Sequence, residues 1–206
     1  MKTRFKHFLA GLATTAAAAV ATAKAHAVDY VGASLENPSA LNSVVSFGAG
    51  ATQSFDVKFG VFTNVTLEFV TLRNELSPIM AFNALVNNFA GFNIEALQVK
   101  LIGGAVFQAP NGTVTPTFGT VGSTSVTPDL VSTTLSAGEG FAINFGNPLA
   151  QGGQTDWTIN FSAVQASSTF GLTVTAMPEP EAYALMLAGL VLVGAVARRR
   201  NCRRTK

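Results

Sequence analysis

The clearest pattern in the chain is an alternation of apolar and polar residues with a period of two. Phe55, Val57, Phe59 and Val61 alternate with polar residues or glycine. The same alternation recurs in four further stretches, at residues 65–69, 141–145, 157–163 and 169–175. Successive side chains of an extended backbone point to opposite faces of a sheet, so each run predicts a half-buried antiparallel strand.

Turn residues, and one segment whose apolar residues have a helical spacing, complete the predicted fold. Glycine, asparagine and proline at residues 146–148, with Gly152 and Gly153, predict a long-looped hairpin over residues 140–163. Only residues 79–89 have a helical spacing of apolar residues, which Pro78 would open. We therefore predict an all-β fold, a single antiparallel, jelly-roll-like β-sandwich of about eight strands with one short helix at most.

The N-terminal segment, residues 1–27, lacks any such periodicity. It contains three early basic residues, an uncharged run over residues 8–23, and a small-x-small sequence formed by Ala25, His26 and Ala27. This order is typical of a helical secretory signal peptide. We expect passage through the secretion translocon, cleavage by signal peptidase after Ala27, and a mature chain that begins at Val28.

The C-terminal segment, residues 177–206, contains a second uncharged run. Pro178, Glu179 and Pro180 precede residues 182–197, which carry no charge, and Arg198, Arg199 and Arg200 follow. Sixteen helical residues rise about 24 Å, so the flanking side chains must help to span a hydrocarbon core of about 30 Å. We predict a C-terminal transmembrane helix in the inner membrane, with the arginines on the cytoplasmic side. A plain tail anchor, with the prolines as a spacer, is the alternative.

The order Pro178-Glu179-Pro180, short apolar helix and Arg198-Arg199-Arg200 resembles the PEP-CTERM sorting signal. This resemblance implies that the membrane transpeptidase exosortase cuts near the tripeptide and releases or reattaches the preceding body, residues 28–176. Phe55-Asp56-Val57-Lys58-Phe59 is similar to the pattern of the FxDxF group of PEP-CTERM proteins, although Asp56 follows Phe55 directly. The implied location is the cell surface or extracellular matrix, after transient anchoring.

Charge and residue types limit what the body does. Residues 28–177 contain three basic and nine acidic residues, a formal net charge of −6, so nucleic-acid binding by counterion release is not expected. The body contains no histidine or cysteine, because His7, His26 and Cys202 all lie near the ends. Serine or cysteine triads and imidazole zinc sites are therefore excluded, and we predict no cofactor, metal or catalytic residue.

Carboxylates remain as candidate site residues. Asp56, Glu68 and Glu75 would suffice for glycoside hydrolysis, which needs only two carboxylates. However, Asp56 and Glu68 occupy polar positions of predicted strands, which favours exposure to solvent. Calcium is a second option, because Asp129, Glu139 and Asp156 offer hard oxygen donors, but no loop has the ligand density of a specific calcium motif.

Two other features allow a binding or a structural interpretation. Trp157 could stack on a sugar, but it alternates in phase with Ile159 and Phe161, which favours the core. Thr113, Thr115 and Thr117, with Thr173 and Thr175, could form an ice-binding array. The preference of threonine for strands explains them more simply.

The sequence thus predicts an exported, non-enzymatic protein with a structural or adhesive role in an exopolysaccharide context. A low-charge surface rich in threonine, serine, asparagine and glutamine can exchange hydrogen bonds with sugars. The alternatives are a carbohydrate-binding module and a carboxylate-based polysaccharide hydrolase.

Overall fold

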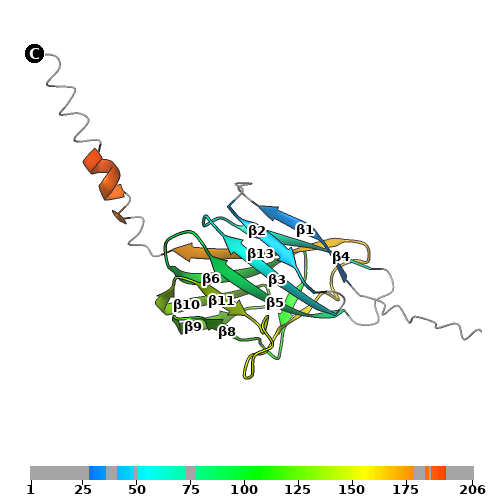
Figure 1. Ribbon diagram of the computed structural model, residues 1–206. Helices are drawn as coiled ribbons and strands as arrows, with labels where there is room; N and C mark the ends of the chain where they lie inside the picture. Colours follow the sequence, from blue (N-terminus) through cyan, green and yellow to red (C-terminus); the bar gives the residue numbers. More distant parts are fainter. Residues whose placement is uncertain are drawn as a thin grey trace, which may run out of the picture.

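Two β-sheets packed face to face form the body of the protein in a computed structural model (Figure 1). The structure describes residues 28–35, 41–48, 51–72, 78–178, 184–185 and 187–193. The first sheet contains, in spatial order, β1 (Val28–Leu35), β4 (Val65–Thr71), β13 (Thr169–Pro178), β6 (Ile94–Ile102), β10 (Leu130–Glu139) and β9 (Thr120–Val126). The second contains β2 (Ser43–Ser46), β3 (Thr52–Phe59), β5 (Ile79–Asn88), β11 (Ala142–Phe145) and β8 (Val114–Pro116), with β12 (Trp157–Asn160) and β7 (Val106–Gln108) alongside. The all-β prediction is confirmed.

The predicted helix over residues 79–89 is wrong, because this segment is strand β5 in the middle of the second sheet. Met80, Phe82, Ala84 and Val86 point into the core in strict alternation. Leu85, on the opposite face of the strand, produced the helical spacing. Neighbouring strands on both edges of β5 satisfy its backbone, which outweighs a weak local helical pattern.

The predicted hairpin over residues 140–163 is also wrong. β11 and β12 do not pair with each other; both run antiparallel to β5, one after the other along the same edge. Phe145 lies opposite Ala84, and Trp157 lies opposite Phe82. The two segments therefore form one interrupted strand, and residues 146–156 loop out between them. β8 and β7 continue the sheet in the same interrupted way.

One strand pair departs from the predicted antiparallel, jelly-roll-like arrangement. β3 and β5 are parallel, with Phe55 opposite Ala84, whereas every other pair in the described residues is antiparallel. A parallel pair needs a crossover connection. Here the chain crosses to the first sheet as β4 before it returns as β5.

Aromatic side chains fill the space between the sheets. Phe55 of β3 meets Phe69 of β4 with ring centroids 5.9 Å apart, which joins the second sheet to the first. Phe69 also stacks on Phe170 of β13 at 5.2 Å. Trp157 is 1% exposed and stacks on Phe145 at 4.9 Å. The prediction that Trp157 belongs to the core is therefore confirmed.

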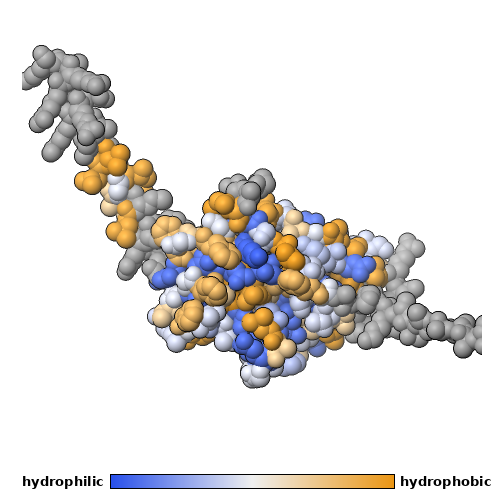
Figure 2. Space-filling view, in the orientation of Figure 1, coloured by the Kyte–Doolittle hydropathy of each residue, from blue (hydrophilic) through white to orange (hydrophobic). Residues whose placement is uncertain are grey.

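Beyond Pro178 the structure describes only residues 184–185 and 187–193, which are helical (Figure 1) and whose side chains are exposed. These residues are mostly hydrophobic, whereas the visible face of the body mixes both kinds of residue (Figure 2). In the described ranges no helix has the length and apolar character needed to cross a membrane. The predicted transmembrane helix, residues 182–197, includes residues outside those ranges and stays a prediction. The predicted signal helix, residues 1–27, lies wholly outside them.

The contact between Phe55 and Phe69, which joins the two sheets, gives a testable prediction about stability. Phe69→Ala should lower the free energy of unfolding by about 3–5 kcal/mol, because a fully buried ring is lost and a cavity remains. Phe47→Ala, at a position that is 70% exposed, is the control and should change it by less than about 0.5 kcal/mol. Urea unfolding of both variants measures the difference. Equal losses would show that Phe69 does not hold the sheets together.

Candidate functional site

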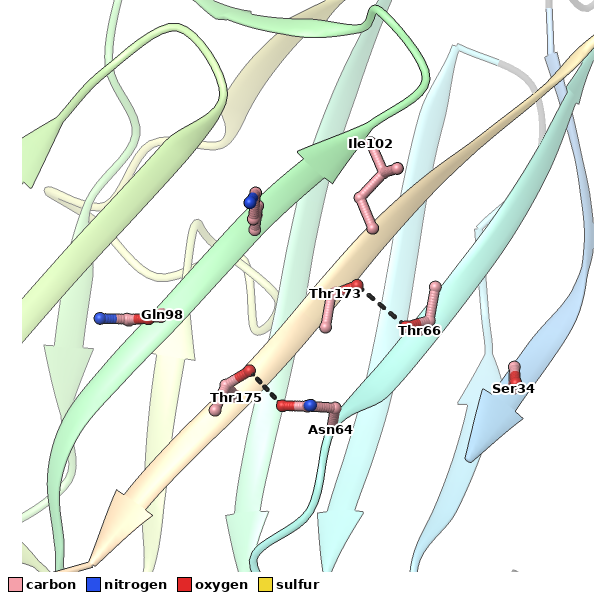
Figure 3. Close-up of a pocket in the computed structure, with 8 residues that line it drawn as sticks. Ser34, Asn64, Thr66, Gln98, Ile102, Thr173 and Thr175 are labelled. Atoms are coloured by element: carbon pink, nitrogen blue, oxygen red, sulfur yellow. Dashed lines mark hydrogen bonds between the residues drawn. The ribbon is translucent and has the colours of Figure 1, made fainter. Parts of the chain in front are cut away.

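A shallow groove crosses the outer face of the first sheet. Its volume is about 490 Å³, and side chains from four neighbouring strands or their ends line it (Figure 3). These are Ser34, Asn64, Thr66, Gln98, Lys100, Ile102, Thr173 and Thr175. The lining residues come from strands that are far apart in sequence, so no local sequence motif predicts the groove.

The period-two alternation determines which residues line the groove. On β13, Leu172 and Val174 face the core, so Thr173 and Thr175 face outward. Strand register then sets the outward residues side by side. Thr173 lies opposite Thr66 of β4 and Lys100 of β6, which gives a polar row perpendicular to the strands.

Hydrogen bonds between neighbouring strands hold the lining side chains in place. The hydroxyl oxygens of Thr66 and Thr173 are 2.9 Å apart, and the Thr175 hydroxyl donates to Asn64 Oδ1 at 2.7 Å (Figure 3). Cross-strand threonine pairs of this kind stabilise a sheet. The groove therefore offers hydroxyl and amide groups in fixed positions.

The chemistry of the groove suits binding. Its described lining contains hydroxyls, amides, the exposed ammonium group of Lys100 and the half-exposed side chain of Ile102, without a carboxylate or an aromatic ring. Hydroxyl and amide groups both donate and accept hydrogen bonds, as sugar hydroxyls do. The sequence predicted a polar surface of this type but not its position.

Asp56 and Glu68, two of the three carboxylates considered for glycoside hydrolysis, do not come together. Asp56 faces outward from β3 in the second sheet, where it accepts a hydrogen bond from Asn87 Nδ2 at 2.6 Å and pairs with Lys58 at 3.6 Å. Glu68 faces outward from β4 in the first sheet. Burial and the charge of Glu68 raise the pKa of Tyr30, on the neighbouring strand β1. Glu75 lies outside the described residues.

Glu139, one of the residues considered for calcium, is fully buried and bound by backbone groups. Its Oε2 accepts from the N–H of Phe118 at 2.6 Å and of Gly119 at 2.9 Å, and its Oε1 accepts from the N–H of Phe141 at 2.7 Å. Burial by itself would raise its pKa, but these bonds and one from Ala142 outweigh burial and hold the pKa below the usual glutamate range. The carboxylate therefore stays ionised and fastens two loops together.

The other two calcium candidates also have structural partners. Asp156 accepts from Asn83 Nδ2 at 3.0 Å and from the Asn147 N–H at 2.9 Å, which closes the loop between β11 and β12. Asp129 accepts from the Thr127 hydroxyl at 3.0 Å within a turn. Within the described ranges, no three histidine, cysteine or acidic residues gather where they could hold a metal ion.

The threonines considered as an ice-binding array are divided between the sheets. Thr115 lies on β8 of the second sheet, and Thr113 and Thr117 flank that strand. Thr173 and Thr175 lie on β13 of the first sheet and belong to the groove. The five residues do not form one array.

Most residues of the predicted sorting and processing sites lie outside the described part of the chain. These are Glu179, Pro180, Ala25, Ala27, Arg198, Arg199 and Arg200. Pro178 is described and is the last residue of β13, where it pairs with Ile94 of β6. The proline-glutamate-proline tripeptide therefore begins where the folded sheet ends.

Replacing Glu139 should expose its role in stability. Glu139→Gln should lower the free energy of unfolding at pH 7 by about 3 kcal/mol, because an amide N–H₂ then faces backbone N–H donors. In the parent protein this contribution is complete above the glutamate pKa of the unfolded chain, about 4.3, and is lost as pH falls through the lower pKa of the folded state. Denaturant unfolding between pH 3 and 7 measures both effects.

Glu68→Gln, on the exposed face of β4, is the matched control for Glu139→Gln and should change stability by less than about 0.5 kcal/mol. Identical pH profiles for the parent protein and Glu139→Gln would contradict the role given to the buried carboxylate.

Comparison with known proteins identifies the C-terminal segment. The family model described as the PEP-CTERM protein-sorting motif matches residues 178–201, which include the tripeptide, the apolar run and the three arginines. No curated protein matches the chain significantly, and no solved structure does so. The motif indicates export to the cell envelope and processing by exosortase. The chain is therefore a PEP-CTERM sorting domain-containing protein.

Proposed function

We propose that the body of this exported protein is a non-enzymatic structural or adhesive module that contacts polysaccharide through the groove of the first sheet. The observation that carries the proposal is the groove itself, in which hydroxyl and amide groups from four strands share one concave surface. Cross-strand hydrogen bonds fix its threonines before any ligand arrives, so little side-chain entropy is lost on binding.

The composition of the groove favours a glycan over other ligands. A polysaccharide presents many hydroxyl groups, and the lining can both donate to them and accept from them. Lys100 places a positive charge in the groove, although the body as a whole has a formal net charge of −6. This local charge also allows the groove to accept acidic sugars. A carbohydrate-binding module that selects one glycan is the narrower alternative, and the same groove would serve it.

The terminal segments give the proposed route. The translocon exports the chain, signal peptidase cuts after Ala27, and residues 182–197 hold the body at the outer side of the inner membrane. Exosortase then cuts near Pro178, Glu179 and Pro180 and delivers the body to the cell surface or to an exopolysaccharide-rich matrix. The match over residues 178–201 supports the exosortase step.

The route predicts the mass of the secreted protein. Intact-mass measurement should find a chain that begins at Val28 and ends near Pro178. Replacing both prolines of the tripeptide, Pro178→Ala with Pro180→Ala, should leave the uncut protein in the membrane fraction. Pro148→Ala, in a loop of the body, is the control and should not alter processing. A secreted product that keeps residues 198–206 would contradict the route.

The groove predicts which side chains bind polysaccharide. Thr66→Val combined with Thr173→Val removes two lining hydroxyls while it preserves side-chain shape and strand preference. Retardation in affinity electrophoresis through the host's own exopolysaccharide should weaken about tenfold, since each lost hydrogen bond costs about 0.5–1.5 kcal/mol.

Thr115→Val combined with Thr158→Val, on outward positions of the second sheet, is the matched control and should bind as the parent protein does. Equal retardation of parent and groove variant would rule the groove out as the binding surface. A panel of purified glycans separates general adhesion from selection of one glycan.

A further inference from the structure

Exposed phenylalanines gather at the end of the body where the chain leaves it. β13 ends at Pro178, opposite Ile94 at the start of β6, and Glu139 at the end of β10 pairs with the same Ile94. The turn over residues 89–93 leads from β5 into β6 at this point. We call this region, with residues 118 and 141, the exit end.

Four of the five exposed phenylalanines in the described part of the chain lie at the exit end. Their exposed fractions are 65% for Phe89, 55% for Phe92, 81% for Phe118 and 58% for Phe141. The fifth, Phe47, lies in the turn between β2 and β3, at the opposite end of the body, where β5 begins. Such a concentration of large apolar side chains at one end marks a contact surface.

Two buried polar side chains, Glu139 and Asn88, hold the backbone of three of these phenylalanines in place. Glu139 accepts hydrogen bonds from the backbone N–H groups of Phe118 and Phe141. Asn88 donates from Nδ2 to the carbonyl of Phe92 and from its backbone to the carbonyl of Phe141, both at 2.7 Å. The rings of Phe118 and Phe141 meet edge to face at 6.1 Å. The loops that carry these residues are therefore ordered by contacts within the body, before the surface meets any partner.

The path of the chain determines what lies opposite this surface. Only three residues separate Pro178 from Ala182, where the apolar run begins. A chain of four residue steps reaches at most about 14 Å, whereas a ten-residue strand such as β13 is about 33 Å long. A bilayer that holds residues 182–197 is thus within reach of the exit end, while Phe47 lies a full strand length away.

We propose that Phe89, Phe92, Phe118 and Phe141 dip into the membrane interface while the chain is tethered, so that the body stands on the bilayer with its exit end down. This inference rests on the proposed function, in which residues 182–197 anchor the chain before processing. The apolar face of an amphipathic helix lies about 5–10 Å deep in the boundary between headgroups and acyl chains, and we expect the four phenylalanines to enter the same layer.

Tethering makes weak individual contacts effective. A surface held within a few residues of its target binds as though its target were at millimolar concentration. Once exosortase removes the tether, the four side chains alone give only marginal membrane affinity, and the body is released. Glu179 and Glu181, which follow Pro178 in the sequence, are acidic and add no attraction to anionic lipid, so the proposed contact is apolar and a zwitterionic bilayer suffices.

Depth-dependent quenching of tryptophan fluorescence tests the proposal. The full chain carrying Phe118→Trp is reconstituted into phosphatidylcholine liposomes whose acyl chains are either plain or brominated. Bromine should quench the introduced tryptophan by at least about twofold if the ring lies in the acyl boundary. Phe47→Trp in the same chain is the matched control and should not be quenched. Trp157 is buried and gives the same background in both proteins.

Liposome flotation of each preparation distinguishes membrane anchoring by residues 182–197 from insertion of the phenylalanines. Protein that floats, with quenching at position 118 and none at position 47, supports the inference. Protein that floats with no quenching at position 118, or with equal quenching at both positions, overturns the inference but leaves the anchor intact. Protein that does not float refutes the anchor and, with it, the inference.

A second introduced site and a cellular assay complete the design. Phe92→Trp should be quenched like Phe118→Trp, and it replaces that variant if its urea unfolding midpoint falls. In exosortase-positive cells, Phe118→Ser combined with Phe141→Ser shows whether the surface serves the enzyme instead. Slower removal of the tail, together with no quenching by bromine, would assign the exit end to exosortase and overturn the lipid contact.

Discussion

The contact between two sheets through a core of phenylalanine rings is the interaction on which the rest of the molecule depends. The body contains no cysteine that could form a disulfide, and its described residues gather no metal site. Burial of apolar surface must therefore supply most of its stability. Phe55 and Phe69 connect the sheets, and the stacked pairs Phe69–Phe170 and Phe145–Trp157 extend the seam along the sandwich. Because the inner faces of both sheets form the core, only the outer faces and the ends of the sandwich can contact a ligand or a membrane.

The sequence allowed the strands to be predicted where one face was clearly apolar and the other clearly polar. This holds for β3, β4 and β13, and the phase of Trp157 placed it correctly in the core. The strand prediction failed at β5. A strand with neighbours on both edges tolerates Leu85 on its outer face and Asn83 as a buried side chain, and these residues obscure the alternation. It failed again over residues 140–163, since no local pattern distinguishes a hairpin from one strand interrupted by a loop.

The candidate site was less accessible from the sequence than the strands were. Polar residues at outward positions could be recognised, but the groove arises only when register places Thr66, Thr173 and Lys100 in one row. The role of Glu139 was equally hidden, because its partners are backbone groups 20 or 21 residues earlier in the chain and two residues later. By contrast, the sorting motif is a contiguous, linear signal, and it was identified from its residues alone.

The position of β13 links the completion of the fold to the sorting step. This strand is the last in the sequence, yet it lies between β4 and β6 in the interior of the first sheet. The sheet therefore stays open, with two unsatisfied edges, until the chain has crossed the membrane as far as Pro178. Folding must await the final stretch of the polypeptide, and the sorting signal follows at once. Until β13 is in place, the facing edges of β4 and β6 remain open to pairing with other molecules.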